Sequence, residues 1–198
     1  MHSINLNFNS WKSISGKYTW MGLTYNYINN DIATATSYDS IGRTVSQAIN
    51  VNGNFNFNGY VGTSMPFFSK KLEIGPNLWA SYAENKSMIN GLENKTEDIR
   101  SSISMDIRLN LEKFSAGVSG YYSYNSAFSS LNNKSNTPYS SQGLSGNVSA
   151  KLPKNFLLES DANYTINSKR SNGYNINYLV WNASFSNITR SNAANFRK

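Results

Sequence analysis

Residues 99–111, IRSSISMDIRLNL, decide the fold because their apolar and polar side chains alternate. Successive side chains of a strand point to opposite faces of its sheet, so alternation with period 2 indicates a strand with one apolar face. The apolar parity holds Ile99, Ile103, Met105, Ile107, Leu109 and Leu111. The charged residues Arg100, Asp106 and Arg108 all have the other parity. We therefore expect a strand with one apolar and one polar face.

The same alternation covers most of the chain. It predicts further strands whose alternating apolar residues span 4–8, 21–27, 49–65, 72–82, 114–124, 144–152, 156–166 and 176–186, with the strands themselves extending beyond the shorter spans. This makes about nine strands, each roughly 9 to 17 residues long. Strands of soluble proteins average about 5 to 6 residues, whereas membrane-spanning strands need about 9 to 11. Strand length therefore favours a membrane-spanning sheet over a soluble β-sandwich.

The predicted connections alternate in length. Short connections are expected at residues 14–17, 68–71, 112–113 and 153–155, and long ones near 29–44, 84–98, 125–141 and 167–175. Short turns on one rim and long polar loops on the other are typical of outer-membrane barrels. We predict an all-β, antiparallel up-and-down transmembrane β-barrel segment of about nine strands, incomplete, with residues 1–198 forming one partial barrel domain.

The charges within the predicted strands give a second pattern. They are Glu73, Arg100, Asp106, Arg108, Lys151, Glu159 and Asp161. All have the parity opposite to the apolar face, and a lipid-facing Arg or Lys near the bilayer midplane costs about 2–4 kcal/mol. We predict that these residues face a polar lumen. A half-buried soluble sheet would show the same parity, so strand length and loop lengths carry the membrane prediction.

Aromatic residues gather at two levels of the predicted strands. Tyr18, Phe67, Phe68, Phe114 and Phe156 lie beside short turns, and Tyr25, Tyr27, Tyr82, Tyr122, Tyr124 and Tyr164 lie near long loops. Tilted strands would place the two rows roughly 21–26 Å apart, close to the height of about 25 Å expected for an apolar band. The rows are therefore expected at the two membrane interfaces.

Composition narrows the function classes. Only 15% of the 198 residues are charged, against roughly 25% in soluble domains. The net charge of +7 comes from scattered residues, which does not favour nucleic-acid binding. There is no cysteine, and no stretch has the roughly 18 apolar residues of a membrane helix. The first ten residues do not resemble a signal peptide, so we expect an internal or truncated piece of an exported protein.

No pattern for catalysis or metal binding is present. His2 is the one histidine, and Asp31 and Asp39 do not have the spacing of an EF-hand loop. Glu159 and Asp161 share a face and could suggest a carboxylate pair for hydrolysis, but a polar lumen wall explains them better. The sequence therefore predicts no enzyme activity, no metal and no cofactor.

Three stretches carry a resemblance to a family. They are NDIATATSYDSIGRTVSQAINVNGNFNFNG (30–59), QGLSGNVSAKLPKNFLLESDANYT (142–165) and YLVWNASFS (178–186). The chain resembles the outer-membrane β-barrel family related to TonB-dependent receptors. The resemblance implies a large barrel that encloses a plug and moves or binds nutrients. No plug-like region precedes the strands, and the chain ends in Asn195-Phe196-Arg197-Lys198 without a terminal aromatic residue, so we expect a barrel fragment.

The resemblance implies a location in the outer membrane of a Gram-negative bacterium. The expected partners are outer-membrane lipid, an unknown small nutrient ligand, and the rest of the barrel with a plug domain outside this chain. Two alternatives stay open. One is a small independent outer-membrane barrel with a structural or adhesion role, in which side chains would fill the lumen. The other is a secreted soluble β-rich protein that binds glycans.

Overall fold

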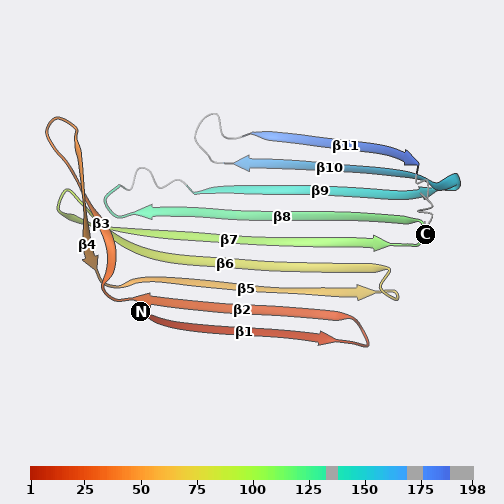
Figure 1. The fold of residues 1–198 in the computed structure, drawn as a ribbon, viewed down its shortest axis with the longest axis horizontal. Helices are drawn as coiled ribbons and strands as arrows, with labels where there is room; N and C mark the ends of the chain where they lie inside the picture. The colour runs from red at the N-terminus through yellow and green to blue at the C-terminus, as the bar shows by residue number, and fades with distance from the viewer. Residues whose placement is uncertain (133–137, 169–175, 188–198) are drawn as a thin grey trace, which may run out of the picture.

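The protein is a single sheet built almost entirely of strands (Figure 1). The computed structural model describes residues 1–132, 138–168 and 176–187. In these ranges the only helical element is a short 3₁₀ turn, η2 (Pro153–Asn155). The strands are β1 (His2–Lys12), β2 (Lys17–Ile28), β3 (Asp31–Tyr38), β4 (Thr44–Val51), β5 (Asn54–Phe67), β6 (Leu72–Ile89), β7 (Leu92–Asn110), β8 (Phe114–Ser129), β9 (Tyr139–Leu152), β10 (Phe156–Ser168) and β11 (Asn177–Asn187). The all-β prediction is confirmed.

The strands follow one another across the sheet. The order is β1-β2-β5-β6-β7-β8-β9-β10-β11, and each neighbouring pair is antiparallel. The predicted number of about nine strands agrees with this path, but β3 and β4 raise the number described to eleven. They form a hairpin beside the path, and β3 also pairs in parallel with the end of β6.

Two connections that the sequence predicted to be long loops contain strands instead. The stretch 29–44 holds β3, and the predicted strand 49–65 is divided into β4 and β5 at Gly53, which has φ +88°. The stretch 84–98 continues β6 and β7 to a two-residue turn at Asn90 and Gly91, both with positive φ. Positive φ at both central residues is what a type I′ hairpin turn requires, and the Asn-Gly pair supplies it.

The short connections lie where they were predicted. The turns after β1, β5, β7 and β9 lie together at one end of the sheet, on the right in Figure 1, and the β2–β3 and β6–β7 connections lie at the other end. Part of the connections after β8 and β10 falls on residues 133–137 and 169–175, outside the described residues. In the described residues the sheet is open, because β1 and β11 are its edges and do not pair with each other.

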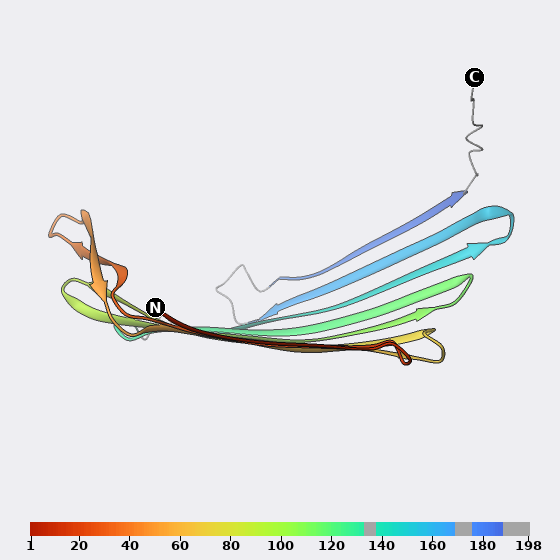
Figure 2. The same ribbon diagram turned by 60° about the horizontal axis from the view of Figure 1, so that its bottom comes forward.

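Backbone stereochemistry shows which face is concave. The N–H of Asn110, at the end of β7, donates to Lys71 O beside β6 (2.7 Å). In Figure 1, β7 runs from left to right above β6, so this N–H points down the page. An L-residue in that orientation directs its side chain toward the viewer, and every second residue of β7 follows it. In Figure 2 the same face is turned upward and the ends of the sheet curl up around it. The face of Asn110 and Asp106 is therefore concave.

Apolar side chains cover the opposite, convex face without being buried. No hydrophobic residue among those described is buried, and Ile103, Met105 and Leu78 are 56%, 47% and 48% exposed. Within the described residues, no other layer of structure therefore packs against the apolar face of this sheet.

Candidate functional site

The seven charged residues predicted to face a lumen all lie on the concave face. Residues directly opposite each other in neighbouring strands share a face, and Glu73 is opposite Arg108, which shares its parity with Arg100 and Asp106. The same face continues across the next three strands, because Arg108 is opposite Gly117, Gly117 is opposite Asn147, and Asn147 is opposite Asp161. Glu159 and Lys151 have the parity of that same face. Asp98 also lies on the concave face, because it is opposite Ala83 and has the parity of Arg100; the sequence pattern had predicted a loop at this position.

The carboxylates of this face bond to hydroxyl and amide groups. Glu73 accepts from Ser64 Oγ (2.9 Å), and Asp106 accepts from Ser119 Oγ. The carboxylate of Asp161 accepts from Asn182 Nδ2 at 2.9 Å. None of the seven charged residues forms an ion pair with another described residue. Serine and asparagine side chains therefore hydrogen-bond these three carboxylates of the concave face.

The ion pairs of the sheet lie beyond the apolar residues, at the end with the β6–β7 hairpin. Lys95 Nζ lies 2.9 Å from carboxylate oxygens of both Glu84 and Glu97. These residues have the parity of the convex face. The register places them next to Tyr82, whose ring is 5.5 Å from that of Phe55. The convex face thus changes from apolar to charged at a row of aromatic rings.

A cluster of aromatic residues lies on the concave face, among asparagines. Its rings are those of Trp11, Tyr18, Trp20, Tyr60 and Trp79. Three ring donors bond to amides of the same face: Tyr18 Oη to Asn9 Oδ1 (3.0 Å), Tyr60 Oη to Asn7 Oδ1 (3.2 Å) and Trp79 Nε1 to Asn58 Oδ1 (2.7 Å). We call these five aromatic residues and three asparagines the aromatic–amide patch.

Two rings of the patch lie over glycines of the neighbouring strand. Tyr60 is directly opposite Gly22, and a Cβ on Gly22 would lie 2.5 Å from the Tyr60 ring. Trp20 is directly opposite Gly62, and a Cβ there would lie 2.4 Å from the indole. The Trp20 ring in turn stacks on Tyr18, with centroids 5.3 Å apart and an interplanar angle of 26°. The backbone at Gly22 covers one side of the Tyr60 ring, which is 42% exposed, whereas the Trp20 ring contacts both the strand at Gly62 and the Tyr18 ring.

Charge is divided unevenly across the concave face. On β1, β2, β5 and β6 only one residue of this face is charged, Glu73, beside the short turn. The other charges of this face lie on β7, β9 and β10. The aromatic–amide patch therefore occupies a neutral half of the face, beside a charged half.

The aromatic–amide patch was not predicted from the sequence, although the sequence contains a signal for it. Tyr18 was assigned to a membrane interface because it lies beside a short turn. It has the same parity as Trp20, and that parity is opposite to the parity of Met21 and Leu23. The register places Tyr18 and Trp20 on the concave face, so proximity to a turn was the wrong criterion.

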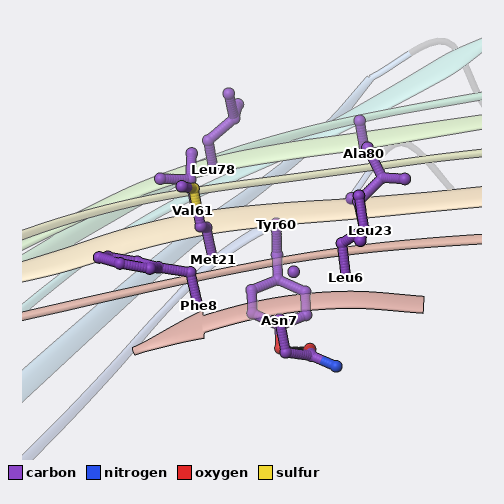
Figure 3. Close-up of a pocket in the computed structure, with 11 residues that line it drawn as sticks. Leu6, Asn7, Phe8, Met21, Leu23, Tyr60, Val61, Leu78 and Ala80 are labelled. Atoms are coloured by element: carbon purple, nitrogen blue, oxygen red, sulfur yellow. Dashed lines mark hydrogen bonds between the residues drawn. The ribbon is translucent and has the colours of Figure 1, made fainter. Parts of the chain in front are cut away.

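The convex face has an apolar hollow of about 500 Å³ over β1, β2, β5 and β6 (Figure 3). Gly59 and Ala80 are opposite each other at its floor, where small residues leave space. Larger apolar side chains surround them: Leu6, Phe8, Met21, Leu23, Val61 and Leu78. The lining of the hollow is therefore mostly apolar.

Two buried asparagines form hydrogen bonds at the end of the sheet with the β2–β3 and β6–β7 connections, which we call the loop end. Asn54, 5% exposed, donates to Asp31 Oδ2 (2.8 Å) and accepts from the N–H of Lys86 (2.9 Å). Asn94, also 5% exposed, accepts from Ser129 Oγ (2.7 Å) and from the N–H of Leu131 (3.3 Å). These amides fix the β3–β4 hairpin and the end of β8 to the body of the sheet.

The described residues contain no group of three or more potential metal ligands among His, Asp and Glu, and no helix long and apolar enough to cross a membrane. Asp39 belongs to a turn, where its carboxylate accepts from Arg43 Nε (2.6 Å) and from the N–H groups of Ile41 and Arg43. The Arg43 guanidinium holds the pKa of Asp39 below its ordinary value.

Comparison with known proteins returned no match: no family model, no curated protein and no solved structure matches this chain.

Proposed function

We propose that this chain is a segment of an outer-membrane β-barrel related to TonB-dependent receptors, whose concave face lines a passage for a nutrient. The observation that carries the proposal is the uncovered apolar convex face of a sheet without a buried apolar core. Hydrocarbon is the environment in which such a face is stable, and a barrel wall is the sheet structure that a bilayer accepts.

The dimensions of the apolar face support the proposal. From Leu72 to Tyr82 on β6, ten residues at about 3.4 Å each and a tilt near 40° span about 26 Å, close to the roughly 25 Å of a barrel's apolar band. Over this height the convex parity of all nine strands of the path holds no Asp, Glu, Lys or Arg. The charges begin at Glu84 on one side and at Lys12 and Lys17 on the other.

The open edges support a segment rather than a complete small barrel. β1 and β11 each have one strand neighbour among the described residues, so each presents N–H and C=O groups on its outer side. Unpaired groups of this kind are costly in a bilayer and would be satisfied by further strands of a larger barrel. In a larger barrel, strands outside this chain would pair with β1 and with β11.

The tryptophans offer a direct test of which face contacts lipid. Trp181 is on the convex face, since it lies opposite Ala162, whereas Trp79 is on the concave face, opposite Tyr60. We would prepare two single-tryptophan chains, retaining Trp181 or Trp79 and replacing the other tryptophans with Phe, in liposomes with brominated acyl chains. We expect the bromines to quench Trp181 strongly and aqueous iodide to quench Trp79. Equal quenching of the two by the lipid, or the reverse order, would refute the proposal.

A further inference from the structure

We infer that the aromatic–amide patch is a binding site for a neutral oligosaccharide. The inference deepens the proposed function, on which it rests, by naming the substrate class for the concave face. It is carried by the combination of flat aromatic rings, unused amide donors and lack of charge in one half of that face.

The rings provide stacking surfaces. Tyr60 lies against the backbone at Gly22 and leaves its outer side open to the concave space, and Trp79 lies opposite Tyr60 on the next strand. Tyr60 is 42% exposed and Trp11 is 61% exposed. A pyranose ring has an apolar face of C–H groups that packs on an aromatic ring of this kind. Rigid aromatic side chains also lose little conformational entropy on binding.

The asparagines provide directional groups for hydroxyls. Asn7, Asn9 and Asn58 each use Oδ1 to accept from a ring donor. Within the part of the chain that the structure describes, their Nδ2 groups have no partner, and an amide nitrogen carries two donors. The ring bonds fix the orientation of the amides, so the free donors are held ready for sugar oxygens.

The charge pattern selects against ionic ligands. A charged ligand loses hydration on binding and needs an opposite charge to compensate. The patch contains no charged residue, and the Glu73 side chain on its flank accepts a bond from Ser64. Anionic or cationic nutrients would be expected on β7, β9 and β10, where Arg100, Arg108 and Asp161 lie.

The test uses the full chain in lauryldimethylamine oxide micelles, a detergent without a sugar headgroup. Maltohexaose and cellohexaose are the neutral probes, the hexamer of galacturonic acid is the anionic probe, and binding is followed by isothermal calorimetry and tryptophan fluorescence. We expect at least one neutral hexasaccharide to bind and the galacturonic acid hexamer not to bind. Failure of both neutral sugars to bind at millimolar concentration, in samples whose circular dichroism shows a folded sheet, would overturn the inference.

A matched pair of variants separates binding from packing. Tyr121 lies opposite Gly143 on the concave face, and a Cβ on Gly143 would lie 2.4 Å from its ring, so it packs as Tyr60 does but outside the patch. We expect Tyr60→Ala and Trp79→Ala to weaken sugar binding about tenfold each, in line with loss of one ring contact. Tyr121→Ala should leave the affinity unchanged. An equal loss in Tyr121→Ala would show that the effect comes from packing and would contradict the site.

The two proposals fail in different ways. If the bromines do not quench Trp181 but the sugar binds with the expected dependence on Trp79, the membrane proposal is wrong and the binding site stands. If Trp181 is quenched by lipid and no neutral sugar binds, the barrel proposal stands and this inference is wrong.

Discussion

The Tyr60 ring fills the space in which a side chain of Gly22 would lie. The two residues are direct partners on β5 and β2, and an added Cβ would approach the ring to 2.5 Å, closer than real Cβ atoms come. Gly22→Ala must therefore displace the end of the ring from its place beside Asn7. The ring is 42% exposed and can turn aside, so we expect a loss in the free energy of unfolding at the lower end of the range of about 1–3 kcal/mol for overpacking, which urea denaturation in micelles would measure.

Gly146→Ala is the control for this substitution. Gly146 is also a strand glycine, but an added Cβ would have only Gly117 O within reach, at 3.8 Å, an ordinary contact. We expect this variant to be as stable as the original chain or slightly more stable, because Ala restricts the unfolded chain. Equal destabilisation by the two substitutions would mean that the ring does not depend on Gly22.

Asn94 should control the order of the loop end. Its buried amide accepts from Ser129 and Leu131, so Asn94→Ala leaves groups on β8 and the following segment without this acceptor. Loss of such a buried partner costs about 1–3 kcal/mol. We expect faster hydrogen exchange at the amide of Leu131 and little change in the centre of β8. Asn85→Ala, at an exposed position on the neighbouring strand, is the control and should not change this exchange.

The faces of the sheet were predictable because alternation is a local property. If Met105 faces the apolar side of the sheet, its direct partners on the neighbouring strands face that side as well, and the same holds for each further strand. Asp106 and Glu159 have the other parity and therefore face the polar side. Short turns were also predictable, since they fall where alternation is interrupted.

The ends of the strands were harder to predict, because hydrophobic alternation stops before hydrogen-bonded pairing stops. Beyond Tyr82 both faces of the β6–β7 hairpin carry polar residues, so the pattern indicated a loop. Backbone pairing nevertheless continues to the turn at Asn90 and Gly91. The Asn-Gly pair was the available signal for this hairpin. The aromatic–amide patch required the register itself, since Trp20 and Trp79 come from strands far apart in the sequence.

Asp39 should show a pKa that depends on Arg43. The guanidinium bond and the N–H groups of Arg43 and Ile41 stabilise the carboxylate and hold its pKa below the ordinary 3.8. A lowered pKa means that the turn is stabilised above pH 3.8 and loses this contribution as pH falls through the lowered value. In Arg43→Gln the pKa should rise toward 3.8, measured by NMR titration of the Asp39 carboxyl carbon. Ser40→Ala, which removes no bond to the carboxylate, should leave the titration unchanged; equal pKa values in Arg43→Gln and the original chain would refute the assignment.

Met105 and Asp106 are neighbours in sequence with opposite environments, and they test the assignment of faces. Met105 lies on the convex face, 47% exposed, in a row with Pro76, Gly120 and Leu144. Met105→Arg would place a charge against hydrocarbon, at a cost of about 2–4 kcal/mol. We expect a large loss of the chain that floats with liposomes in a density gradient, whereas Met105→Leu should float normally.

Asp106→Asn should float like the original chain. Asp106 accepts from Ser119 on the concave face, and an asparagine oxygen can accept the same bond. Removal of a charge from a polar face brings no contact with hydrocarbon, so there is no cost to membrane assembly. A loss for Asp106→Asn as large as that for Met105→Arg would mean that lipid contacts both faces. Normal flotation of Met105→Arg would mean that the apolar face is covered by protein, and the barrel proposal would then be wrong.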